Sequence, residues 1–242
     1  MPEQPFLEHL EELRRRLLFC LLVLILASCL VYSQMDRILA VLVEPVGQLV
    51  FLGPAEAFLA RLKLAVLGGF ILGVPVWTWQ LWRFVLPGLR PSETRAIAGL
   101  LPATVLFFYM GAAFSYWIVL PVGLDFLLSF GSERVVPMIS IGNYFGFVGL
   151  MALIFGFAFQ MPLLLLASVR AGVLRLEQLL AARRYVILGS FVLGAVLTPP
   201  DVVTQVLMGG CLIALYEASL LLIRFTGGRI HEKPVEAVCR DD

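Results

Sequence analysis

Few residues in this sequence have the types and spacing that catalysis requires. The two histidines, His9 and His231, lie near opposite ends of the chain, and no His-Glu-x-x-His, Gly-x-Ser-x-Gly or glycine-rich phosphate loop occurs. The four cysteines stand singly, without the CxxC spacing of redox or zinc sites. We therefore expect no enzymatic activity, no metal site and no cofactor.

Polar side chains inside long apolar runs are the next candidates for function. Glu217 lies in the last apolar run, and an acid at membrane depth is costly enough to mark a functional site by default. Gln160 lies in an earlier run. Both side chains would also serve as hydrogen-bonding contacts between helices, so a functional and a structural role stay open for each. Trp77, Trp79 and Trp82 are expected to form an interfacial aromatic belt.

Two further acids lie outside the apolar runs. Glu12 belongs to a stretch with apolar residues at helical spacing, which predicts an amphipathic helix leading directly into the first apolar run. Glu93 follows a Pro-Gly turn, at a position where an acid favours the start of a helix. Taken alone, each acid fits a structural role.

The elements that must position these residues are membrane-spanning helices. Of the 242 residues, 60% are hydrophobic and 14% are charged, and the mean hydropathy is +0.95. A helix needs about 20 apolar residues to cross the hydrocarbon core. Runs of that order occupy Leu17–Gln34, Leu64–Trp82, Ala96–Leu120, Tyr144–Val169, Tyr185–Leu197 and Val202–Ile223. We predict an all-α, polytopic membrane protein with one six-helix domain over residues 1–225 and a disordered cytoplasmic tail over 226–242.

The distribution of Lys and Arg predicts the orientation of these helices. Six spans place 14 of the 18 basic residues on one side and 4 on the other, namely Arg37, Arg61, Lys63 and Arg134. Basic loops stay in the cytoplasm, so both termini are expected there, in the cell inner membrane. The outer loops cover residues 35–63 and 121–143, and the first should hold a short amphipathic helix at Asp36–Val43. A net charge of +1 argues against nucleic acid as a partner.

The fifth apolar run is shorter than the others. A helix over Tyr185–Leu197 would reach only about 20 Å, against a core of about 30 Å. We therefore expect either local thinning of the bilayer or a hairpin that ends inside it.

Four stretches, in this order, resemble the TatC family: "HLEELRRRLL", "PVWTWQLWRFVLPGL", "LFFYMGAAFSYWIVLP" and "RRYVILGSFVLGAVLTPPD". The resemblance covers the chain from about His9 to Phe225. It implies a glove-shaped arrangement of six helices in the core receptor of the twin-arginine translocase. Such a receptor recognises folded cargo through Arg-Arg signal peptides and organises export driven by the proton-motive force. The implied partners are these signal peptides, small single-span subunits of the TatA or TatB type, the lipid bilayer and further copies of the receptor.

The resemblance also assigns roles to individual positions. Glu12 and Glu93 match the two acids that receive the twin arginines, and Arg14 and Phe84 match neighbouring recognition positions. Positions related to partners or translocation fall on Pro45, Phe58, Gln160, Thr198, Pro199, Pro200, Asp201, Gln205 and Glu217. This chain departs from the family pattern twice: Gln160 replaces a commonly acidic residue, and Pro91 replaces a basic residue, with Arg90 beside it.

Two other classes of function stay open on the residues alone. A secondary transporter of a small ion or solute would use Glu217 and Gln160 as coupling groups, although we find no internal repeat of the kind that transporters often show. A structural membrane scaffold would tolerate neutralisation of its cytoplasmic acids. Crosslinking of an Arg-Arg signal peptide to the cytoplasmic loops distinguishes the three functions.

Overall fold

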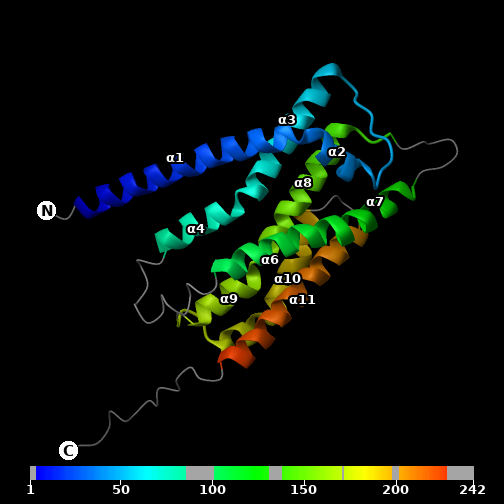
Figure 1. The fold of residues 1–242 in the computed structure, drawn as a ribbon. Helices are drawn as coiled ribbons and strands as arrows, with labels where there is room; N and C mark the ends of the chain where they lie inside the picture. The colour runs from blue at the N-terminus through cyan, green and yellow to red at the C-terminus, as the bar shows by residue number, and fades with distance from the viewer. Residues whose placement is uncertain (1–3, 86–100, 131–137, 171, 198–201, 228–242) are drawn as a thin grey trace, which may run out of the picture.

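The computed structural model describes residues 4–85, 101–130, 138–170, 172–197 and 202–227 (Figure 1). These residues are mostly helical, and the one isolated β-bridge among them pairs Val50 with Ser140. The helices are α1 (Gln4–Ser33), α2 (Met35–Val43), α3 (Pro54–Leu72), α4 (Val74–Val85), α6 (Leu101–Phe114), a π-helical turn (Ser115–Val119), α7 (Leu120–Leu128), α8 (Ile141–Ala158), α9 (Met161–Arg170), α10 (Leu176–Leu197) and α11 (Val202–Gly227).

Length and apolar composition allow six membrane spans in the described residues. Five helical stretches qualify alone, and α3 with α4 forms a sixth that is bent by 50°. The prediction of six spans is therefore confirmed. The predicted helix at Asp36–Val43 is also present, as α2, and its first residue, Met35, is buried.

The helices form two groups that diverge toward one end of the molecule. In Figure 1, α1 and α4 lie to one side of the bundle of α6 to α11, although α4 contacts α6, and α3 packs on both α1 and α8. α1 packs on α3, α3 packs on α8, and α10 packs on α11. The start of α1 and the end of α11 lie toward the same end of the molecule, opposite α2 (Figure 1).

The bend between α3 and α4 has a local cause. Gly73 caps α3, and Pro75 follows in the first turn of α4, where its missing N–H costs nothing. Trp77 folds back over the bend, because its indole N–H donates to the Phe70 carbonyl at 2.9 Å and its ring stacks on Phe70 with centroids 5.9 Å apart. This bend turns α4 away from the line of α3.

The opposite end of the molecule is closed by bonds between distant segments. The Tyr116 and Tyr144 hydroxyls donate to carbonyls of α2 at 2.8 Å and 2.7 Å. The Glu56 carboxylate accepts from the Ser140 hydroxyl and, at 3.3 Å, from the Gly142 amide at the start of α8. Acids are favoured at helix N-termini, so Glu56 joins α3 to α8. These bonds hold α2, the start of α3 and the start of α8 together, whereas α4 begins at the other end of α3.

The fifth helix contradicts the prediction made from the sequence. α10 begins at Leu176 and has 22 residues, so it spans about 33 Å at about 1.5 Å per residue. The predicted start at Tyr185 is wrong because Arg183 and Arg184 lie inside the helix and do not end it. Arg183 is paired with Glu217, and the Arg184 guanidinium lies 4.8 Å from the centre of the Tyr185 ring.

Four other features of the spans also differ from the prediction. The second span begins at Pro54, ten residues before Leu64, and the third extends to Leu128. The fourth is interrupted at Phe159 and Gln160, ahead of Pro162. The last helix reaches Gly227, two residues beyond the predicted domain end, and most of the expected tail lies outside the described residues.

Candidate functional site

A groove of about 600 Å³ lies between the two helix groups. Apolar and aromatic side chains of α1, α3, α4, α6, α8 and α9 form most of its wall. The polar side chains that line it include Arg16, Thr78, Gln80, Thr104 and Gln160. A groove of this size with few polar groups suits an apolar ligand that is oriented by a small number of polar contacts.

Trp77 and Trp82 line this groove, whereas Trp79 is exposed. Two of the three tryptophans therefore belong to the groove wall, and their place at the membrane interface stays a prediction. The bend at Gly73 turns Trp77 inward, and helical spacing alone does not reveal that bend.

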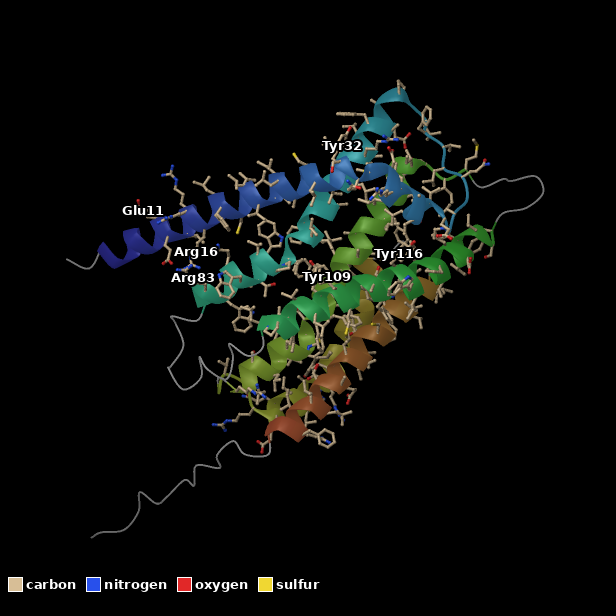
Figure 2. The ribbon with its side chains drawn as sticks, in the orientation of Figure 1. Glu11, Arg16, Tyr32, Arg83, Tyr109 and Tyr116 are labelled. Carbon is tan, nitrogen blue, oxygen red and sulfur yellow. The ribbon has the colours of Figure 1, made fainter. Side chains whose placement is uncertain are left out.

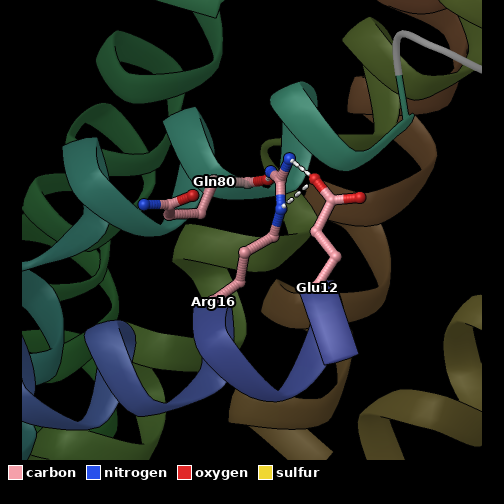
Figure 3. Close-up of polar contacts among 3 residues, drawn as sticks. All are labelled: Glu12, Arg16 and Gln80. Carbon is pink, nitrogen blue, oxygen red and sulfur yellow. Dashed lines mark hydrogen bonds and ion pairs between the residues drawn. The ribbon is translucent and has the colours of Figure 1, made fainter. Parts of the chain in front are cut away.

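Glu12 lies near the N-terminal end of α1 and is bound by Arg16 of the same helix (Figure 3). The spacing of four residues brings the two side chains together on one face. The Arg16 Nε atom donates to Glu12 Oε1 at 3.1 Å, and its Nη2 atom donates to the same oxygen. The Nη1 atom reaches across to α4 and donates to the Gln80 carbonyl at 3.2 Å. This guanidinium therefore connects Glu12 to the neighbouring helix.

The two partners differ strongly in exposure. The Glu12 side chain is 51% exposed, whereas the Arg16 side chain is 15% exposed. Figure 2 shows Arg16 between α1 and α4 near Arg83, with Glu11 on the other side of α1. Glu12 thus presents a negative charge at the surface beside one wall of the groove.

The other predicted recognition residues are only partly described. Arg14 is exposed on α1. Phe84 lies in the last turn of α4, so its backbone is at the same end of the molecule as Glu12. Glu93 lies outside the described residues, and the expected pairing of two acids is therefore untested.

Gln160 lies at the break between α8 and α9 and faces the groove. Its side-chain nitrogen donates to the Thr104 carbonyl at 3.1 Å and to the Gly156 carbonyl at 3.3 Å. Thr104 belongs to α6, so Gln160 makes the expected bond between helices. The side chain is buried, and its oxygen has no hydrogen-bond partner among the described residues.

Glu217 is not among the residues that line this groove and lies on the α10–α11 hairpin. Its Oε2 atom accepts from Arg183 Nη2 at 2.6 Å. On the same hairpin, the Gln205 side chain donates to the Phe191 carbonyl at 3.2 Å. Thr198, Pro199, Pro200 and Asp201, which connect the two helices, lie outside the described residues.

The two outer positions form no cluster with the residues above. Pro45 is exposed in the turn after α2, and Phe58 is 58% exposed near the start of α3. Both belong to the end of the molecule opposite Glu12. The predicted site residues therefore fall into four regions: the end of α1 and α4, the groove, the outer turns, and the α10–α11 hairpin.

Sequence reasoning missed Arg16 and Glu56. The spacing of Arg16 from Glu12 contains a usable signal, because charges four residues apart pair on a helix. Glu56 and Ser140 are 84 residues apart and carry no local signal.

The comparisons with known proteins agree with this architecture. Residues 8–210 match the family model of the Sec-independent protein translocase protein TatC. The chain is 39% identical to the TatC protein of Aquifex aeolicus over 226 residues, which cover 90% of this chain and 94% of the relative. It is 35% identical to the Escherichia coli TatC protein over 233 residues, which cover 93% and 90% of the two chains.

A solved structure has the same fold. The crystal structure of the twin-arginine translocase receptor TatC in the detergent DDM superposes with a TM-score of 0.79 at 39% identity. It covers 88% of this chain and 98% of that one. On the family model, the relatives and the fold, this chain belongs to the TatC family of multi-pass membrane proteins.

Proposed function

We propose that this chain is the core receptor subunit of a twin-arginine translocase. It binds the Arg-Arg signal peptides of folded cargo proteins and organises their proton-motive-force-driven export. Support comes from its membership of the TatC family and from its likeness to structures described as the translocase receptor.

The observation that carries the proposal is the exposed carboxylate of Glu12 beside one wall of an apolar groove. A signal peptide has two matching parts, paired arginines and an apolar stretch. A carboxylate accepts a forked guanidinium through two parallel bonds, and Lys cannot reproduce that geometry. Glu12 and Glu93 each receive one arginine in this proposal, with Arg14 and Phe84 beside them.

The groove supplies binding free energy that the two acids alone cannot provide. An exposed ion pair contributes at most about 1 kcal/mol. Apolar surface that leaves water contributes about 25 cal/mol per Å², so an apolar stretch that moves from water into the groove gains more than one ion pair provides. The arginine contacts then decide specificity, and the apolar stretch supplies most of the affinity.

The receptor lies in the inner membrane with both termini in the cytoplasm. The excess of basic residues on one side supports this orientation, as does the placement of the start of α1 and the end of α11 toward the same end of the molecule (Figure 1). Glu12 then faces the compartment in which cargo folds.

Small single-span subunits, the surrounding lipid and further copies of the receptor are the other partners. Pro45 and Phe58 serve these contacts on the outer side, and their exposure is compatible with that role. Gln160, Thr198, Asp201, Gln205 and Glu217 serve them within the membrane or at the hairpin. Glu217 is already paired with Arg183, which makes it a poor coupling group for a small-solute transporter.

Binding of an Arg-Arg signal peptide by a receptor with Glu12→Ala and Glu93→Ala tests the proposal. The peptide carries a photocrosslinker next to its arginines, and a Lys-Lys peptide is the specificity control. We expect the double variant to lose Arg-Arg crosslinking while it inserts and elutes in detergent like the parent. Crosslinking at the parental level would refute the proposal.

A further inference from the structure

We infer that Arg16 is a positioning residue for signal recognition: it fixes the Glu12 carboxylate in one orientation, and this gives the receptor its preference for Arg over Lys in the signal. This inference rests on the proposed function of Glu12. Neither the composition nor the resemblance of the sequence assigns Arg16 a role.

The first argument is the geometry of the contact in Figure 3. Two nitrogens of Arg16 donate to one oxygen of Glu12, and the third donates to the Gln80 carbonyl on α4. The guanidinium is planar and rigid, so these contacts restrict the rotation of the Glu12 side chain as well as its distance from α4. A Glu side chain on a helix surface without such a partner samples several rotamers.

The second argument is the difference in burial between the partners. Arg16 has only 15% of its side chain exposed and lines the groove, whereas Glu12 remains 51% exposed while paired. Displacing Arg16 would leave a largely buried guanidinium without its carboxylate, which is strongly unfavourable. An incoming signal arginine is therefore expected to approach the exposed part of Glu12 while Arg16 stays in place.

The third argument concerns specificity. Arg16 reduces the attraction of Glu12 for any cation, Arg or Lys alike, since it brings a positive charge beside the carboxylate. A fixed carboxylate favours a ligand whose donors match its geometry, and only the guanidinium presents a fork. Pre-organisation of this kind improves discrimination by lowering the ordering cost for the matching ligand.

The experiment measures the ratio of two dissociation constants on the full-length receptor in nanodiscs. Fluorescent signal peptides that differ only in Arg-Arg or Lys-Lys are titrated against the parent, Arg16→Gln, Arg16→Lys and Arg15→Gln. Arg15 is exposed on α1 next to Arg16, so Arg15→Gln removes the same charge without touching the contact. We expect both Arg16 variants to lower the Lys-Lys to Arg-Arg ratio about fivefold, equivalent to about 1 kcal/mol, and Arg15→Gln to leave it unchanged.

The ratio separates positioning from the other roles of a buried arginine. If Arg16 only clamps α1 to α4, its variants weaken both peptides equally and the ratio stays at the parental value, which overturns the inference. A parental ratio in Arg16→Lys overturns it as well, because charge alone would then suffice. A parent receptor that does not distinguish the two peptides contradicts the proposed function itself. Should Arg16→Gln fail to fold, Arg16→Lys retains the charge and decides the question.

Discussion

Glu217 shows how a single contact changes what a residue can be expected to do. Its carboxylate is paired with Arg183 at 2.6 Å, and the Arg183 Nε atom is buried without a hydrogen-bond partner among the described residues. The two side chains are 42% and 41% exposed at the protein surface, but both lie inside helices long and apolar enough to cross the membrane. Removing one member there leaves an unpaired charge in apolar surroundings, whereas removing both members is often neutral. We favour a structural role for the pair, as the connection between α10 and α11.

This role leads to a prediction for three variants. Arg183→Met and Glu217→Met should each lower the amount of folded receptor, and the double variant should recover to about the parental level. Fluorescence-detected gel filtration in detergent measures the folded fraction, and export of an Arg-Arg cargo measures function. A double variant that folds normally but does not export would show that Glu217 acts in translocation.

Contacts between residues a few positions apart in the sequence were predictable. Contacts between residues that are distant in the sequence were not. The pairing of Glu12 with Arg16 follows from positions four residues apart. The Glu217 pair was hidden because Arg183 looked like the end of a loop, and only the packing of α10 on α11 brings it close. The Gln160 bond to Thr104 matches the expectation of a contact between helices, but its partner could not be named from the sequence.

At the scale of elements, the bend between α3 and α4 determines the shape of the groove. A methyl group added at Gly73 would lie 2.7 Å from the Trp77 ring, closer than real contacts allow. The φ angle of Gly73 is −77°, so the backbone itself would tolerate another residue. The conflict is therefore with the indole, which would have to leave Phe70 and the groove wall.

We predict that Gly73→Ala destabilises the receptor by about 1–3 kcal/mol, the usual cost of overpacking. Gly189→Ala is the matched control, because nothing lies within 4 Å of its added methyl group. In a helix this control should be neutral or stabilising by up to about 1 kcal/mol. Thermal unfolding in detergent compares the two. Equal unfolding temperatures would show that Trp77 is not fixed against the bend.

The number of spans was easier to predict than their ends. Long apolar runs dominate the signal for a membrane helix, and all six were found. The start of the fifth helix was misplaced because Arg183 and Arg184 lie inside it, and the break ahead of Pro162 in the fourth span was not predicted. A proline removes one hydrogen bond and bends a helix, but neighbouring helices within a membrane can satisfy the freed carbonyl.

At the scale of the whole molecule, the orientation in the membrane is a direct prediction. A receptor without its native cysteines is given one cysteine, at Arg15 on α1 or at Ser129 after α7. A thiol reagent that cannot cross the inner membrane, added from outside, should label Ser129→Cys and leave Arg15→Cys unlabelled until the membrane is opened. Labelling of Arg15→Cys in intact cells would show that the orientation is the reverse of the predicted one. Glu12 would then face away from the compartment in which cargo folds.

The membrane around the α10–α11 hairpin is expected to be thin, for a reason other than the length of α10. The α10 helix is long enough to cross the core, so helix length no longer argues for thinning. Its apolar part is still short, because only the residues from Tyr185 to Leu197 follow the arginine pair, and they cover about 20 Å. Arginine and tyrosine side chains prefer the interface, and Arg184 contacts the Tyr185 ring in the manner of such an anchor.

If Arg184 and Tyr185 lie at the cytoplasmic headgroups, the far end of the hairpin cannot reach the level of an ordinary outer interface. The bilayer should then thin locally, at a modest cost per ångström of mismatch, and a thinner barrier lowers the cost of moving polar cargo past it. A spin label at Val202, the first residue of α11, should therefore lie closer to the membrane midplane than a label at Ser129 after α7. Depth is measured from the relaxation caused by oxygen and by a water-soluble nickel complex. Equal depths at the two positions would mean that α10 inserts its arginines below the headgroups instead, held there by Glu217, and that the hairpin does not thin the membrane.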